Sequence, residues 1–178
     1  MYFNKSEYNN DKCILNYCTY YPYRIHGEKN PQFDETSATL LALKRSEKYA
    51  IDSIFNLLER DLHNNVVVAI VPSSTANTTT HGLYKVANKL AKKGKVDGSS
   101  CLVRHTSIDK LATGGNRNID VHLNSVKVEN NAIIYDKYVI LLDDITTSGN
   151  SLKACKQLLL EAGAKGVQCL AIGKTEGY

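Results

Sequence analysis

The sequence lacks the features that mark secreted and membrane-spanning proteins. Its first ten residues, MYFNKSEYNN, contain no apolar core of the kind that a secretion signal needs. The longest apolar runs, such as residues 66–71, are far too short to cross a bilayer. We therefore expect a cytoplasmic protein with no membrane contact.

The cysteines also lack a recognisable pattern. There are five of them in 178 residues, and no two form a CxxC pair. An odd and scattered set indicates neither a zinc knuckle nor a disulfide framework, so we expect reduced thiols.

The net charge of +4 is small, and it suits an anionic small ligand as well as a weak polyanion. Internal repeats and linkers are missing too, and the length fits a single domain.

Strand patterns alternate with helical patterns along the chain. The run VVVAIVP (66–72) is typical of a strand buried on both faces. Apolar residues at helical spacing precede it over 37–62, with a break near Ser46, and follow it over 83–94. Further strands are expected at 101–105, 120–128, 138–142 and 166–173, and a further helix at 150–162. This order predicts an α/β fold, a doubly wound, mostly parallel twisted sheet with helices on both faces.

The first 36 residues form the least regular part of the sequence. They hold six of the eleven tyrosines and the piece CILNYCTYYPYR, which can form one or two short strands. We expect residues 1–36 to form a small N-terminal hood and residues 37–178 to form the α/β core. The tyrosines either pack or contact a second copy in a homodimer, or they offer a stacking surface to a flat ligand.

The stretch VILLDDITTSGNS (139–151) carries most of the functional information. Asp143 and Asp144 follow a buried strand, where two carboxylates suit a vicinal diol or a metal held through water. Hydroxyl side chains and Gly149 come next, directly before a helix whose N–H groups attract phosphate. The sequence therefore predicts a ribose 5-phosphate site. The alternative is a plain N-cap at Ser148 or Asn150, with the acids on the surface.

These thirteen residues resemble the phosphoribosyl-pyrophosphate (PRPP) loop of the type I phosphoribosyltransferases. A weaker likeness over about 66–173 is nearest to the ComF-type and amidophosphoribosyltransferase-like branch. The resemblance implies that Asp143 and Asp144 hold the ribose hydroxyls, and Mg²⁺ through water. It also implies a 5-phosphate site made of Thr146, Thr147, Ser148, Gly149, Asn150 and Ser151.

Two other loops match features of that family. Ser73, Ser74 and Thr75 follow the first core strand, where the family binds diphosphate; an ordinary polar turn is the alternative. Arg104, Lys110 and Arg117 surround Gly114-Gly115 and resemble the loop that closes over the site. The resemblance thus implies a reaction centre of Asp143, Asp144, Arg104 and Arg117, with Lys110 binding PRPP.

The implied activity is transfer of ribose 5-phosphate from PRPP to a nitrogen nucleophile, with Mg²⁺ as cofactor and release of diphosphate. Thr147 stands where the 6-oxopurine enzymes of the family carry an acid, which argues against hypoxanthine or guanine as acceptor. Two alternatives stay open: a PRPP-binding regulator without catalysis, and a nucleic-acid-linked accessory protein of ComF type that uses the basic face of 85–95. Nucleic acid is the less favoured partner.

A second motif near the end of the sequence is incomplete. Gly173-Lys174-Thr175 resembles the end of a nucleotide-binding P-loop, but Gln168 occupies the position of the required upstream glycine. We therefore expect the tail merely to leave the last strand.

Overall fold

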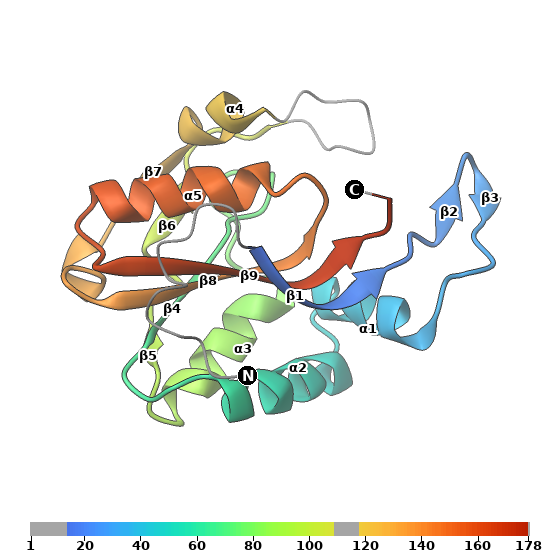
Figure 1. The fold of residues 1–178 in the computed structure, drawn as a ribbon, viewed down its shortest axis with the longest axis horizontal. Coiled ribbons are helices and arrows are strands. Elements are labelled where there is room, and N and C mark those ends of the chain that lie inside the picture. Colours follow the sequence, from blue (N-terminus) through green and yellow to red (C-terminus); the bar gives the residue numbers. More distant parts are fainter. Residues whose placement is uncertain (1–13, 109–117, 178) are drawn as a thin grey trace.

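A computed structural model describes residues 14–108 and 118–177. At its centre lies a five-stranded sheet whose neighbouring strands are all parallel, which confirms the predicted α/β class (Figure 1). Across the sheet the strands are β1 (Ile14–Tyr20), β9 (Gly166–Thr175), β8 (Tyr138–Thr146), β4 (Val67–Ile70) and β5 (Val96–Asp97).

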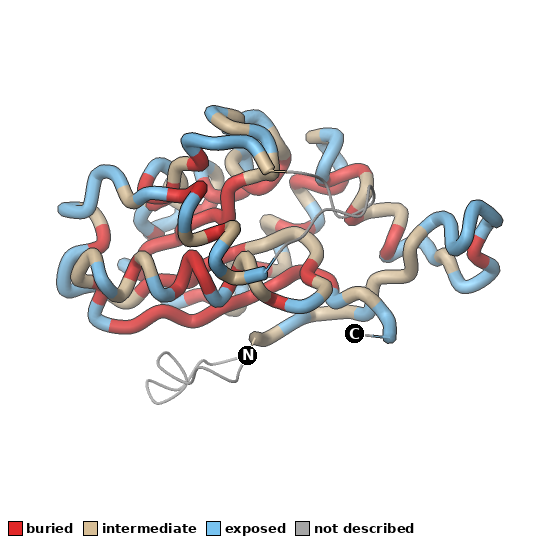
Figure 2. Tube along the Cα trace, turned by 90° about the horizontal axis from the view of Figure 1, so that it is seen from above, coloured by how far each residue is buried: buried red, intermediate tan, exposed pale blue. Residues whose placement is uncertain are grey.

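Helices cover both faces of the sheet. One face packs against α1 (Glu35–Lys44), α2 (Lys48–Asp61) and α3 (Gly82–Ala91), and the other against α5 (Asn150–Glu161). Side chains alternate along each strand: in β4, Val68 and Ile70 face the first group of helices, and Val67 faces α5. Figure 2 shows the buried residues concentrated in the layer between these two groups of helices. Burial on both faces is what the continuous apolar runs predicted.

The helix boundaries follow local signals in the sequence. The side chain of Asp34 caps α1 by accepting a hydrogen bond of 2.7 Å from the Ser37 N–H. Ser46 then adopts a positive φ of 61°, and this separates α1 from α2 near the predicted break. Helix α3 is capped by His81, whose ring accepts a hydrogen bond from the Leu83 N–H.

Two strand predictions need correction. The strand β6 (Leu102–Arg104) does not join the parallel sheet; it pairs antiparallel with β7 (Val126–Val128), and the two-residue β5 occupies the sheet edge instead. Residues Ile119–Leu123 form the helix α4, so the strand predicted over 120–128 is wrong in its first half. Asn118 explains the difference, because its side chain accepts a 3.1 Å hydrogen bond from the Val121 N–H and starts a helical turn. A 3₁₀ turn, η3 (Asn131–Ile133), follows β7.

One piece of the N-terminal part joins the sheet, and another piece projects from the body. β1 is an edge strand parallel to β9, whereas β2 (Arg24–Ile25) and β3 (Glu28–Lys29) form a hairpin that projects from the body (Figure 1). Tyr17 packs against the helix-side core and donates a 2.9 Å hydrogen bond to Asp61. Tyr20 packs against the same core, so packing accounts for these two tyrosines. The division of the chain at residue 36 stays a prediction.

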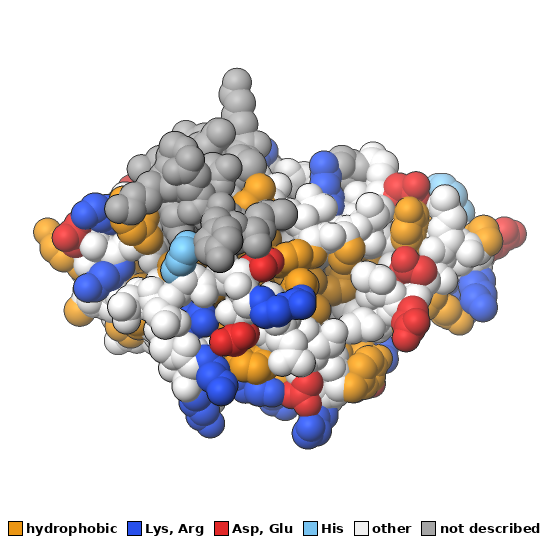
Figure 3. Space-filling view, turned by 60° about the horizontal axis from the view of Figure 1, so that its bottom comes forward, with side chains coloured by type: hydrophobic (Ala, Val, Ile, Leu, Met, Phe, Trp, Pro, Cys, Tyr) orange, Lys and Arg blue, Asp and Glu red, His pale blue; other side chains and the backbone are white. Residues whose placement is uncertain are grey.

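Basic side chains on α2 and α3 are interrupted by acidic ones. Asp52 forms ion pairs with Lys48 at 2.8 Å and with Lys89, and Lys89 also lies over the Phe55 ring. In Figure 3, Lys and Arg side chains occur at several places with acidic and apolar side chains between them. Within the described ranges, no helix has the length and apolar character needed to cross a membrane.

Candidate active site

A pocket of about 330 Å³ lies beyond the carboxyl ends of β4 and β8. The chain passes from β4 to α3 on one face of the sheet and from β8 to α5 on the other, so the two loops diverge here. Open α/β sheets bind ligands at such switch points. The pocket also falls within the size range of small-molecule sites.

Most of the predicted site residues line this pocket. Those that do are Ser73, Ser74, Arg104, Asp143, Asp144, Thr146, Thr147, Ser148, Gly149 and Ser151. Thr75 and Asn150 are not part of its lining. Lys110 and Arg117 lie outside the described residues. The structure thus gathers two loops that are some 70 residues apart in the sequence, and the roles assigned to their side chains stay predictions.

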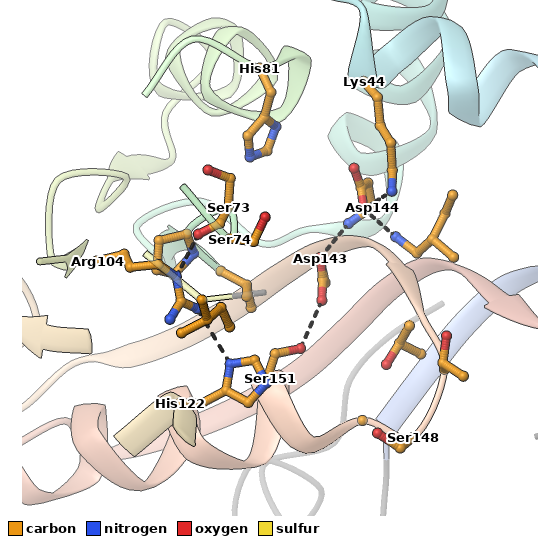
Figure 4. Close-up of a pocket in the computed structure, with 17 residues that line it drawn as sticks. Lys44, Ser73, Ser74, His81, Arg104, His122, Asp143, Asp144, Ser148 and Ser151 are labelled. Carbon is orange, nitrogen blue, oxygen red and sulfur yellow. Dashed lines mark hydrogen bonds and ion pairs between the residues drawn. The ribbon is translucent and has the colours of Figure 1, made fainter. Parts of the chain in front are cut away.

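The two acids are held in fixed orientations by hydrogen bonds. Asp143 accepts hydrogen bonds from the Asp144 N–H (3.0 Å) and from the Ser151 hydroxyl (3.3 Å). Asp144 accepts one from the Ile145 N–H (2.6 Å) and lies 3.5 Å from Lys44 Nζ (Figure 4). Burial raises the pKa of Asp143 above its ordinary range, and the charge of Asp144 raises it further. Two oriented carboxylates at one pocket wall provide acceptors for hydroxyl groups or a cation.

The segment from the end of β8 to the start of α5 holds one buried hydroxyl without a partner among the described residues. Gly149 is the N-cap residue of α5, so neither Ser148 nor Asn150 holds that position, and no side-chain cap closes the helix start. Thr146 is 4% exposed, and its buried hydroxyl has no hydrogen-bond partner within the described part of the chain. Buried polar groups are almost always satisfied. A buried hydroxyl without a partner among the described residues, close to a helix start whose first N–H groups have no acceptor within the helix, suits an anion such as phosphate.

Gly149 is required at its position for two reasons. Its φ of +78° is in the left-handed region, and a Cβ there would lie 2.3 Å from the end of the Ile14 side chain. We expect Gly149→Ala to lower the free energy of unfolding by about 1–2 kcal/mol, measured by urea denaturation. In an Ile14→Ala background, which removes the contact, the penalty should shrink to the part caused by the backbone. An unchanged unfolding midpoint in Gly149→Ala would contradict this account.

Thr175 supports the turn from the end of β9. Its hydroxyl lies 3.1 Å from the Thr147 hydroxyl and donates a 3.2 Å hydrogen bond to the Thr146 carbonyl. The expectation that residues 173–175 merely leave the last strand is therefore incomplete, because β9 continues through Thr175. The pairing of Thr146 with Lys174 in the sheet brings these groups together. The register in which β8 pairs with β9 cannot be predicted from a sequence pattern.

Arg104 acts within the protein as a connector. It is 2% exposed, and its Nε donates a hydrogen bond of 2.5 Å to the Ser73 carbonyl. Its other nitrogens contact the Ser125 hydroxyl and, at 3.3 Å, His122 Nδ1. Arg104 thereby ties β6 and α4 to the loop that follows β4.

Three basic residues that line the pocket were not expected from the sequence: Lys44, His81 and His122. Lys44 comes from the end of α1, His81 from the start of α3 and His122 from α4. They lie in or directly before separate helices, and only the tertiary fold brings them to the acids. To predict any of them from the sequence, one would have to know which helix ends face the pocket.

The donor set fits a magnesium ion that is shared with a ligand. In the described ranges, no group of three or more His, Cys, Asp or Glu side chains is placed to hold a metal by itself. Mg²⁺ keeps several waters and usually binds through one or two carboxylates together with substrate phosphates. Asp143 and Asp144 supply that number of carboxylates.

The family of the chain follows from comparison with known proteins. Residues 39–174 match the phosphoribosyl transferase domain, and this range covers most of the chain. The protein therefore belongs to the phosphoribosyl transferase domain family, and its parallel sheet agrees with the type I fold of that family. Membership indicates phosphoribosyl transfer as the general chemistry and PRPP as the general ligand. The search of curated proteins found no match.

Proposed function

We propose that the protein transfers ribose 5-phosphate from PRPP to a nitrogen nucleophile and releases diphosphate. The observation that carries the proposal is the buried hydroxyl of Thr146 at the end of β8, which has no partner within the described residues and lies in the same pocket as two oriented acids. A phosphate would accept a hydrogen bond from that hydroxyl and would be favoured by the positive end of the α5 helix dipole. The acids would accept hydrogen bonds from the two ribose hydroxyls.

The remaining group of PRPP, its diphosphate, then extends toward the loop after β4. Ser73 and Ser74 line the pocket there, and Arg104 fixes the loop through the Ser73 carbonyl. Main-chain groups and small hydroxyl side chains allow close approach of a diphosphate. Lys110 and Arg117 are proposed to close over it.

The reaction breaks the bond between the anomeric carbon and a diphosphate oxygen, and the electron pair leaves with that oxygen. The lone pair of the nitrogen forms the new C–N bond, and the nitrogen loses a proton to solvent. Oriented donors around the diphosphate stabilise the negative charge that develops on it. Asp143 and Asp144 would hold Mg²⁺ through water, and the ion supplies additional positive charge for the leaving group.

The acceptor is defined so far by exclusion. Thr147 offers a hydroxyl where the 6-oxopurine enzymes carry an acid, so we propose an acceptor other than hypoxanthine or guanine. In the described chain, the pocket lining begins at Lys44 and includes no residue of 14–36. The role of the N-terminal hood, the nearer likeness to the ComF-type branch and a homodimer all stay predictions.

Calorimetry and a diphosphate-release assay test the proposal. We expect PRPP to bind in the presence of Mg²⁺, and Asp144→Asn to weaken that binding at least tenfold, since a hydrogen bond to a charged group contributes about 1.5–3 kcal/mol. Diphosphate release with one member of a panel of nitrogen nucleophiles would establish the transferase. Binding without turnover across the panel would favour the regulator, and no binding of PRPP would exclude both.

A further inference from the structure

His81 enters the pocket from the start of α3. It lines the wall together with Ser73 and Ser74, and its ring points into the pocket in Figure 4. The loop that carries it is anchored at both ends. The Ser46 hydroxyl donates a 2.9 Å hydrogen bond to the Thr80 carbonyl, and Arg104 holds Ser73. The ring also packs edge-on against Tyr84, with 4.9 Å between the ring centres.

The hydrogen bonding of His81 determines which of its nitrogens carries a proton. Nδ1 accepts a hydrogen bond of 3.3 Å from the Leu83 N–H, which is the capping interaction of α3. An accepting nitrogen has no hydrogen, so in the neutral ring the proton is on Nε2. Nε2 lies at the end of the ring farthest from the main chain. Within the described ranges, the His81 side chain makes no other hydrogen bond.

The surroundings keep the ring neutral. Burial lowers the pKa of His81, and this outweighs the opposite effect of Asp144, while Lys44 lowers the pKa further. The N-terminal end of a helix also disfavours a positive charge. A neutral ring that caps the helix with Nδ1 retains one function toward the pocket, which is to donate from Nε2.

We propose that His81 is a positioning residue whose Nε2–H donates a hydrogen bond to an oxygen of the diphosphate group of the ligand. The assignment rests on the proposed function, because it takes PRPP as the ligand and the loop after β4 as the place of its diphosphate. The direction fits: Ser73 and Ser74 lie beside the ring, and the turn that suits the 5-phosphate lies at the far side of the two acids. Neither the capping bond nor the ring tautomer has to change when the ligand binds.

The first test reads the tautomer without any ligand. Long-range ¹H–¹⁵N correlation spectra of the histidine rings at neutral pH are assigned by the signal that disappears in His81→Asn. We expect the pattern of a neutral ring protonated on Nε2. A ring protonated on Nδ1, or on both nitrogens, would overturn the proposal.

The second test measures binding of inorganic diphosphate with Mg²⁺, and of ribose 5-phosphate, by calorimetry. Asparagine is a good N-cap but is too short to replace Nε2 or the contact with Tyr84, so His81→Asn should stay folded and unfold at a slightly lower temperature than the wild type. We expect its diphosphate affinity to fall about tenfold or more and its ribose 5-phosphate affinity to stay unchanged. His26→Asn is the matched control, because His26 is exposed on the β2–β3 hairpin and has a positive φ that asparagine tolerates.

The outcomes separate this inference from the proposed function. If the wild type binds PRPP and diphosphate, and His81→Asn binds diphosphate equally well, the role of His81 is wrong and the proposed function stands. If the wild type binds neither PRPP nor ribose 5-phosphate, the proposed function fails. Loss of diphosphate affinity in His81→Asn, with the Nε2–H tautomer present, supports the inference.

Discussion

Replacing Asp143 by asparagine is expected to make the ligand-free protein more stable at neutral pH while removing its affinity for PRPP. Burial and the neighbouring charge of Asp144 raise the pKa of Asp143 above its ordinary value of 3.8. The ionised carboxylate is therefore less favourable in the folded than in the unfolded chain. Hydrogen bonds from the Asp144 N–H and from Ser151, together with the charge of Lys44, offset only part of that cost.

The sign of the pH dependence follows from linkage. Because the folded pKa of Asp143 lies above the unfolded one, the unfolded state binds fewer protons than the folded state between the two values. Stability is thus lost as pH rises through that window. Asparagine keeps the acceptor oxygen but has no proton to lose. We expect Asp143→Asn to gain about 1–2 kcal/mol at pH 8 and less at pH 5, measured by urea denaturation at both pH values.

A matched control is available on the surface. Asp136 is 73% exposed, has a positive φ of 53° that asparagine tolerates, and pairs with Lys165 at 3.7 Å. Its replacement by asparagine should change stability by no more than about 0.5 kcal/mol at either pH. A variant Asp143→Asn that is less stable than the wild type at pH 8 would refute the account. In calorimetry with Mg²⁺, the same variant should lose PRPP affinity, which separates the site from the stability of the fold.

Much of this site could be predicted from sequence because its central part is contiguous. The residues 139–151 contain a buried apolar run, two acids, a hydroxyl-rich segment and a helix start in unbroken order, and each of these has its own local signal. The strand itself is longer than predicted: β8 continues past Leu142 through both acids to Thr146, because these residues pair with β9. Strand β4 and the polar loop after it are similar: the apolar run stops at Pro72, and small hydroxyl residues follow. Parallel strands then bring the two loops to the same sheet edge by topology alone.

What the sequence could not reveal depends on contacts between distant segments. Lys44 and His122 lie in two different helices and His81 caps a third, and nothing local distinguishes them from a surface lysine, a core histidine or an ordinary helix cap. Thr175 supports the turn only through the register of β9 beside β8.

The errors in secondary structure have a related cause. β5 has two residues, too few for any periodic pattern, so β6 was predicted to take its place in the sheet. In 120–128, apolar and polar residues alternate, but the first four residues, 120–123, are few enough to fit a single helical turn equally well. The cap at Asn118 decides between these options in the folded chain.

Arg104→Lys is expected to cause a large loss of stability even though it keeps the positive charge. Arg104 is buried and uses three of its nitrogens to contact the Ser73 carbonyl, the Ser125 hydroxyl and His122 Nδ1. A lysine ammonium is a compact charge and does not reproduce the planar fork that meets three partners at once. Buried polar groups left without partners cost about 1–3 kcal/mol each, so we expect a loss of about 2–4 kcal/mol in urea denaturation.

The same change should loosen the loop after β4 at Ser73, because it removes the side-chain link from β6 to the Ser73 carbonyl, whereas the bond from the Asn77 N–H to the Arg104 carbonyl remains. Binding of Mg²⁺-diphosphate should therefore weaken in Arg104→Lys, whereas binding of ribose 5-phosphate at the β8–α5 turn should change little. Ser125→Ala removes one partner and keeps the contact with Ser73, so it should cost about 1 kcal/mol and leave diphosphate binding intact. If Ser125→Ala weakens diphosphate binding as much as Arg104→Lys does, Arg104 does not act through the Ser73 carbonyl.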